Sequence, residues 1–119
     1  MALVVRAFPV KDKNEVLKFV GEVTGRAEDA RRFYEGFGVE NEKWFFQDAN
    51  DVGPIVIGVT EVAEPLENVA REFAAMDEGF GAWFKQRVLQ LSGVDENEKP
   101  LGPETELIYE FDGRGTRSA

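Results

Sequence analysis

The side chains that could carry chemistry in this chain are carboxylates, hydroxyls, amines and guanidinium groups, because the sequence has neither cysteine nor histidine. The lack of cysteine excludes disulfides, thiolate metal sites and thiol nucleophiles. The lack of histidine removes the commonest general base, the usual haem ligand and most transition-metal sites. We therefore expect neither a metal site nor a cofactor, and we assign no catalytic residue from the sequence.

Five residues are candidates for a ligand-binding site: Arg6, Trp44, Phe46, Thr60 and Glu110. Each lies in a segment expected to be a strand, and alternation along the strands places all five on one face of a sheet. Arg6 can orient an anionic or carbonyl-bearing ligand there. Alternatively, Arg6 forms a structural ion pair with Glu106 and Glu110 on the neighbouring strand.

Four segments rich in β-branched and aromatic residues predict strands, at residues 3–10, 42–48, 55–62 and 105–111. Asp12 followed by Glu15 fits a capping box, so a helix is expected to start there. Apolar residues then recur with helical spacing as far as about Glu35.

A second long helix is expected after Pro65, which suits a first helical position. Apolar residues trace one face of it as far as Leu91, and Ser92-Gly93 ends it. Gly79 and Gly81 make a weak point within it, because glycine is a poor helix former.

This β-α-β-β-α-β order predicts an α+β, ferredoxin-like fold. Right-handed crossovers give a four-stranded antiparallel sheet in the order 4-1-3-2, with two helices on one face. The expected domain covers residues 1–112, and residues 113–119 read as a flexible tail.

Alternation along the strands separates two sheet faces. One set is uniformly apolar and is expected to be the helix-covered core: Leu3, Val5, Ala7, Phe45, Ile55, Ile57, Val59, Leu107, Tyr109 and Phe111. The other set is mixed and includes the five candidate site residues. We expect the mixed face to stay uncovered, to pair with a second copy and to enclose a ligand cavity.

The formal net charge is −9, and no basic stripe interrupts it. Nucleic acid and anionic membrane surfaces are therefore poor partners, because both require lysine and arginine. No apolar run approaches the roughly 20 residues that span a bilayer. The N-terminus lacks the pattern of a signal peptide, so a cytoplasmic location is expected.

The C-terminal third carries a family resemblance in four stretches: residues 83–86 (WFKQ), 89–95 (LQLSGVD), 100–103 (PLGP) and 106–109 (ELIY). It resembles a family of small bacterial hypothetical proteins in the dimeric α+β barrel superfamily. The resemblance implies a homodimer with a cavity between sheet and helices. Haem-degrading members of that superfamily use a histidine ligand, which this chain lacks.

Three functions remain open from the sequence. The first is a homodimer that binds a small apolar or aromatic ligand. The second is a cofactor-independent enzyme of monooxygenase, cyclase or isomerase type acting on an aromatic or polyketide-like substrate. The third is a protein-interaction module that uses the open sheet.

Overall fold

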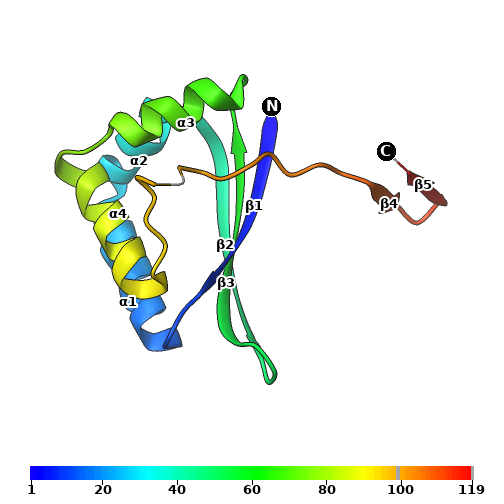
Figure 1. Ribbon diagram of the computed structural model, residues 1–119, viewed down its shortest axis with the longest axis horizontal. Helices are drawn as coiled ribbons and strands as arrows, with labels where there is room; N and C mark the ends of the chain where they lie inside the picture. The colour runs from blue at the N-terminus through cyan, green and yellow to red at the C-terminus, as the bar shows by residue number, and fades with distance from the viewer. Residues whose placement is uncertain (99, 119) are drawn as a thin grey trace.

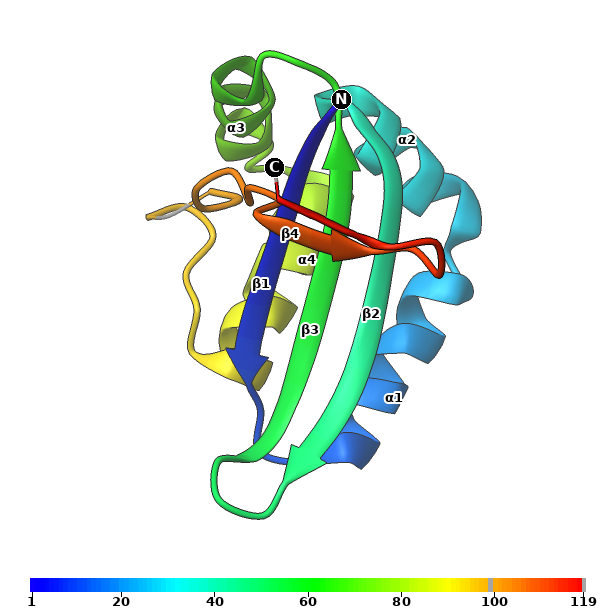
Figure 2. The same ribbon diagram turned by 90° about the vertical axis from the view of Figure 1, so that its right-hand side faces the viewer.

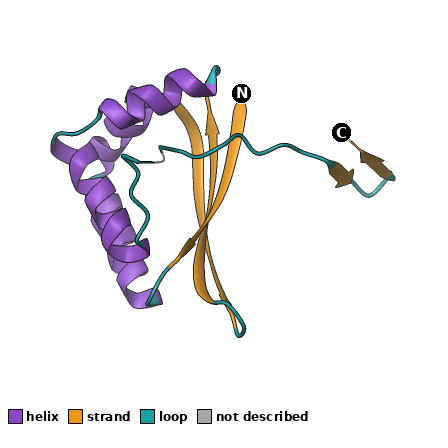
Figure 3. Cartoon of the chain, in the orientation of Figure 1, coloured by secondary structure: helices purple, strands orange, loops and turns teal. Residues whose placement is uncertain are grey.

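The chain folds with helices on one side of an antiparallel sheet, so the predicted α+β class is confirmed (Figure 1). The computed structural model describes residues 1–98 and 100–118. Its elements in chain order are β1 (Ala2–Pro9), α1 (Lys13–Thr24), α2 (Ala27–Phe37), β2 (Val39–Ala49), β3 (Gly53–Val62), α3 (Leu66–Ala75), α4 (Gly79–Ser92), β4 (Tyr109–Phe111) and β5 (Thr116–Ser118). Figure 3 shows the helices as one layer and the long strands as the other.

The main sheet of the described residues has three strands in the order β1-β3-β2, all antiparallel. The predicted fourth strand does not join it. Instead, β4 pairs with β5, because a turn at Gly113 closes a local hairpin and Asp112 N–H donates to Gly115 O at 3.3 Å. The three-strand order matches part of the expected order 4-1-3-2, while no strand among residues 1–98 and 100–118 fills the fourth position beside β1.

The two long helices predicted from the sequence are each divided in two. Asp12 caps α1 as expected, since its side chain accepts from Asn14 N–H at 3.0 Å. The first break lies at Gly25, which follows α1 directly. The second break precedes Gly79, whose φ of +57° lies in the left-handed region that favours glycine. Glycine therefore marks both interruptions.

The faces of the sheet are the reverse of those predicted. In β1, Val4 is 1% exposed and faces the helices, whereas Val5 is 40% exposed and faces away. Thr60 of the mixed set is likewise buried, and Phe45 of the apolar set is exposed. Figure 2 looks onto this uncovered apolar face, with the helices behind the sheet. Alternation separates the two faces but does not say which one the helices cover.

Aromatic rings form much of the core between the helices and the mixed face. Phe33 packs against Phe84 with ring centroids 4.9 Å apart, and Phe37 stacks on Phe73 at 4.7 Å. Aromatic pairs in such geometries add to the stabilisation from burial. These contacts join α2, α3 and α4 into one layer.

Two glycines allow the helix layer to close around Met76. A Cβ on Gly36 would lie 2.5 Å from Met76 Cε, and a Cβ on Gly81 would lie 3.1 Å from both Met76 Cβ and Met76 O. Gly36 and Gly81 belong to the two Glu-Gly-Phe-Gly stretches of the sequence. Both stretches therefore occur where the chain needs a close approach.

Gly81→Ala tests this packing. The added methyl group meets the backbone of Met76, so we expect the free energy of unfolding to fall by about 1–3 kcal/mol. Gly21→Ala is the matched control, because no atom lies within 4 Å of its added Cβ. Gly21→Ala should raise the free energy of unfolding by about 0.5–1 kcal/mol, because alanine is a better helix former than glycine. Urea unfolding measures both, and a stabilised Gly81→Ala variant would contradict the close approach.

Candidate functional site

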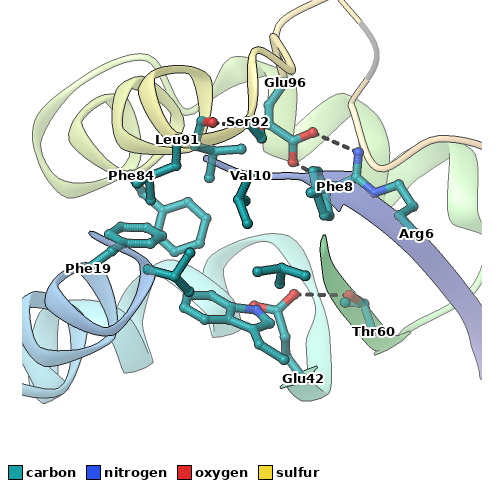
Figure 4. A pocket seen from close by; sticks show the side chains of 15 residues that line it. Arg6, Phe8, Val10, Phe19, Glu42, Thr60, Phe84, Leu91, Ser92 and Glu96 are labelled. Atoms are coloured by element: carbon teal, nitrogen blue, oxygen red, sulfur yellow. Dashed lines mark hydrogen bonds and ion pairs between the residues drawn. The ribbon is translucent and has the colours of Figure 1, made fainter. Parts of the chain in front are cut away.

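A cavity of about 80 Å³ lies between the mixed sheet face, α1 and α4 (Figure 4). One water needs about 10–15 Å³ on this measure, so the cavity holds more than a single solvent molecule. Its walls are mainly apolar and include Phe19 from α1 and Phe84 and Leu91 from α4. Few polar groups reach it, which is typical of small-molecule sites.

A carboxylic acid, Glu42, borders this cavity from β2. Antiparallel pairing places Glu42 opposite Thr60 of β3, and Thr60 Oγ1 donates to Glu42 Oε1 at 2.9 Å. Glu42 as a residue is half-buried, but its second oxygen, Oε2, is buried and has no hydrogen-bond partner among residues 1–98 and 100–118. An unpaired buried oxygen is costly, so it is a strong candidate for contact with a ligand.

Burial raises the pKa of the Glu42 carboxyl above its ordinary value of 4.5, because the charged form loses its hydration. The hydrogen bond from Thr60, the nearby polar groups of Tyr34 and Trp44, and the positive charge of Arg6 act in the opposite direction and are outweighed. Among the described residues, only Thr60 has hydrogen-bond geometry to this side chain. Glu42 can therefore donate a proton to a hydrogen bond when protonated and accept one when ionised.

Tyr34 and Trp44 complete the surroundings of this carboxyl group. Burial, and then the nearby Glu42 charge, raise the pKa of the Tyr34 hydroxyl, so it stays a neutral phenol. Trp44 stacks on Phe19 with ring centroids 5.4 Å apart. Glu42 and Trp44 line the cavity, and together with Tyr34 they also line a second, more open hollow of about 390 Å³ beside β2. The carboxyl group therefore borders two hollows.

An ion pair spans the cavity on the side of β1. Arg6 donates from both terminal nitrogens to Glu96, at 2.7 Å for each bond, and its guanidinium lies 4.7 Å from the centre of the Phe8 ring. Glu96 is only 3% exposed, whereas the Arg6 side chain is 23% exposed, so the pair is partly shielded from water. Such two-pronged pairs fix geometry as well as charge. The pair fastens the loop after α4 to β1.

The predicted ion pair of Arg6 with Glu106 and Glu110 is wrong. Glu110 belongs to β4, which does not lie beside β1, and its Oε1 is 3.2 Å from Arg117 Nη2. Because the fourth strand is not added to the sheet, the partner of Arg6 comes from the loop after α4 instead.

Three of the five predicted site residues meet at the cavity: Arg6, Trp44 and Thr60. Phe46 is not among the residues that line it, and Lys13 Nζ lies 5.2 Å from the centre of its ring. Glu110 sits outside, on β4. Sequence reasoning missed Glu42 and Glu96. The alternation that placed Trp44 on the mixed face also places Glu42 there, so that signal was present.

Among the described residues, no group of three or more acidic, histidine or cysteine side chains is arranged to hold a metal ion. No helix in residues 1–98 and 100–118 has the length and apolar character needed to cross a membrane. Comparisons with protein-family models, curated proteins and solved structures found no match for this chain. Its function must therefore be inferred from the geometry of the site.

The raised pKa of Glu42 predicts a pH dependence of stability. Between the unfolded value near 4.5 and the higher folded value, the folded state binds more protons, so the free energy of unfolding falls as pH rises. The stabilisation is complete at pH values below the pKa of Glu42 in the unfolded state. It is lost as pH rises through the pKa of Glu42 in the folded state. Glu42→Gln, which cannot ionise, should lack this loss.

We therefore expect the advantage of Glu42→Gln over the wild type to grow with pH, by about 1.4 kcal/mol for each pH unit between the two pKa values. Denaturant unfolding from about pH 5 to about pH 8 measures it. Glu40→Gln, an exposed change on the same strand, is the control and should run parallel to the wild type. If the free energy of unfolding of Glu42→Gln followed that of the wild type in parallel over this pH range, the raised pKa of Glu42 would be refuted.

Proposed function

We propose that this chain binds a small, largely apolar molecule in the cavity beneath the sheet, with Glu42 as its polar anchor. The observation that supports this proposal most directly is the buried Oε2 atom of Glu42, which has no partner among the described residues. A ligand that supplies one hydrogen bond would satisfy it, whereas a purely apolar ligand would leave it unpaired.

The chemistry of the walls narrows the class of ligand. Phe19, Trp44 and Phe84 offer flat aromatic surfaces, which favour an aromatic or similarly planar molecule. Arg6 is already paired with Glu96, so it is not free to neutralise an anionic ligand. We therefore propose a neutral molecule that carries a hydroxyl or amine group.

We also propose that the chain acts as a homodimer. The uncovered sheet face has an apolar row across its three strands, in which Ala7 pairs with Ile57 and Ile57 pairs with Phe45. Val5 and Val59 form part of the adjacent row. A contiguous apolar face of this kind marks an interaction surface. A second copy placed sheet to sheet would remove it from water.

An enzymatic role is the second candidate, and the environment of Glu42 favours it. A carboxylic acid with a raised pKa beside an apolar cavity is suited to proton transfer. This favours the isomerase and cyclase types among the cofactor-independent reactions considered above. Tyr34 stays a neutral phenol near the same carboxyl group, because burial and the Glu42 charge raise its pKa.

Binding can be tested with p-cresol and toluene, which have the same ring and methyl group but differ by one hydroxyl. We expect p-cresol to bind about tenfold more tightly, because one hydrogen bond to Glu42 is worth roughly 1–1.5 kcal/mol. Fluorescence of Trp44 in a Trp83→Phe background reports occupancy of the cavity. In Glu42→Leu the preference for p-cresol should vanish while toluene still binds.

Two results would contradict this binding site. Equal affinities of the two probes in the wild type would show that Glu42 is not a polar anchor. An unchanged preference in Glu42→Leu would place the hydrogen bond elsewhere. Thr60→Val serves as a comparison, because it removes the partner of Oε1 but leaves Oε2 available.

Proton transfer can be tested with benzisoxazole. A base removes its C3 proton, the N–O bond breaks, and 2-cyanophenolate forms. We expect the wild type to accelerate this elimination as pH rises through the pKa of Glu42, and Glu42→Gln to lose a hundredfold or more of that rate, about the size of a general-base contribution. Equal rates in the two proteins would contradict the enzymatic candidate without affecting the binding proposal.

A further inference from the structure

The chain ends in an arm, defined here as residues 105–118, which leaves the body at the edge of β1. Thr105 N–H donates to Leu3 O at 2.8 Å, and beyond this point the arm extends away from the uncovered sheet face (Figure 1). Its apolar side chains lie in the open, between 56% and 72% exposed: Leu107, Ile108, Tyr109 and Phe111. Four exposed large apolar side chains within five residues of a projecting segment are typical of an interaction surface.

The arm already has a defined shape, so it does not need a partner in order to form a hairpin. Tyr109 pairs with Ser118 and Phe111 pairs with Thr116. Arg117 Nη2 lies 2.6 Å from Asp112 Oδ2 and 3.2 Å from Glu110 Oε1, so these three charges interact with one another inside the arm. An isolated two-stranded hairpin is only marginally stable in water. Packing against another surface would therefore stabilise the arm. Its exposed apolar side chains, rather than its charged ones, are available for such packing.

The same chain has the complementary surface on its sheet. Phe45 is 52% exposed at the end of the row Ala7–Ile57–Phe45. Tyr109 and Phe111 lie two residues apart in β4 and so share one side of it, and Leu107 is exposed just before this strand. Both surfaces are apolar, and neither covers the other within one copy, because the arm projects outward (Figures 1 and 2).

We infer that the arm of each copy docks on the uncovered sheet face of a second copy, with Leu107, Tyr109 and Phe111 against the row that contains Ile57 and Phe45. Such an exchange is symmetric, since each copy contributes one arm and one face, and it closes without leaving a free surface for further copies. This inference rests on the proposed homodimer and names the segment that holds it together.

Disulfide trapping tests the exchange directly, because the chain has no cysteine of its own. Tyr109→Cys and Phe45→Cys are made in separate proteins that carry tags of different length, mixed, and oxidised. We expect the disulfide-linked dimer that contains one chain of each tag length to form at least tenfold faster from this mixture than from a control mixture. In the control mixture, Leu17→Cys replaces Phe45→Cys. Leu17 is the matched control, because it is an equally exposed apolar residue on the helix side.

Sedimentation of charge variants gives a second readout. Leu107→Glu/Phe111→Glu alters exposed positions only, so the fold should persist, and we expect the dimer dissociation constant to rise a hundredfold or more. Leu17→Glu should leave the dimer unchanged. Circular dichroism checks the fold of each variant.

Three outcomes would overturn the exchange, and they separate it from the proposals above. A dimer that persists in Leu107→Glu/Phe111→Glu rejects the arm but keeps the sheet-to-sheet dimer. A monomeric wild type rejects both. A single chain carrying Tyr109→Cys and Phe45→Cys that closes within itself shows that the arm covers its own face. Binding of p-cresol is measured separately and depends on none of these results.

Discussion

The structure depends on one constraint: the helices cover the sheet face that carries Arg6 and Glu42, not the face that carries the apolar row of Ala7, Ile57 and Phe45. Burying a charge is costly unless it is paired. Arg6 is therefore matched by Glu96 through two bonds of 2.7 Å, which fastens the loop after α4 to β1. Glu42 is matched only in part, by Thr60. The cavity lies between these two polar arrangements, and the other face of the sheet stays uncovered by the helices.

Much of the fold follows from local patterns in the sequence. The three long strands, the start of α1 at Asp12 and the helical character of the two connecting segments all depend on residues close together in the chain. The breaks at Gly25 and before Gly79 were weakly signalled, because glycine within a helix bends it in some contexts and ends it in others. The segment that forms β4 could pair with β1 or with the nearby β5. The sequence pattern does not indicate which of the two pairings forms.

Part of the candidate site can likewise be predicted from local patterns in the sequence. Alternation brought Arg6, Trp44 and Thr60 onto one face, and the structure places all three at the cavity. The sequence pattern places Glu42 on the same face, two residues before Trp44, but it does not indicate that the helices bury this carboxyl group. Glu96 comes from a polar loop with no periodic pattern. Only the tertiary structure could pair it with Arg6.

The cavity and the arm are joined by one short segment, yet the structure separates them mechanically. Leu101, between Glu96 and the arm, is buried in the core at 4% exposure, and Thr105, the first residue of the arm, is hydrogen bonded to Leu3. These two attachments hold the chain on the body before its exposed part. We therefore expect a displacement of the arm to be taken up beyond Thr105 and not to reach the ion pair of Glu96. Self-association and ligand binding would then be independent properties of the two faces of one sheet.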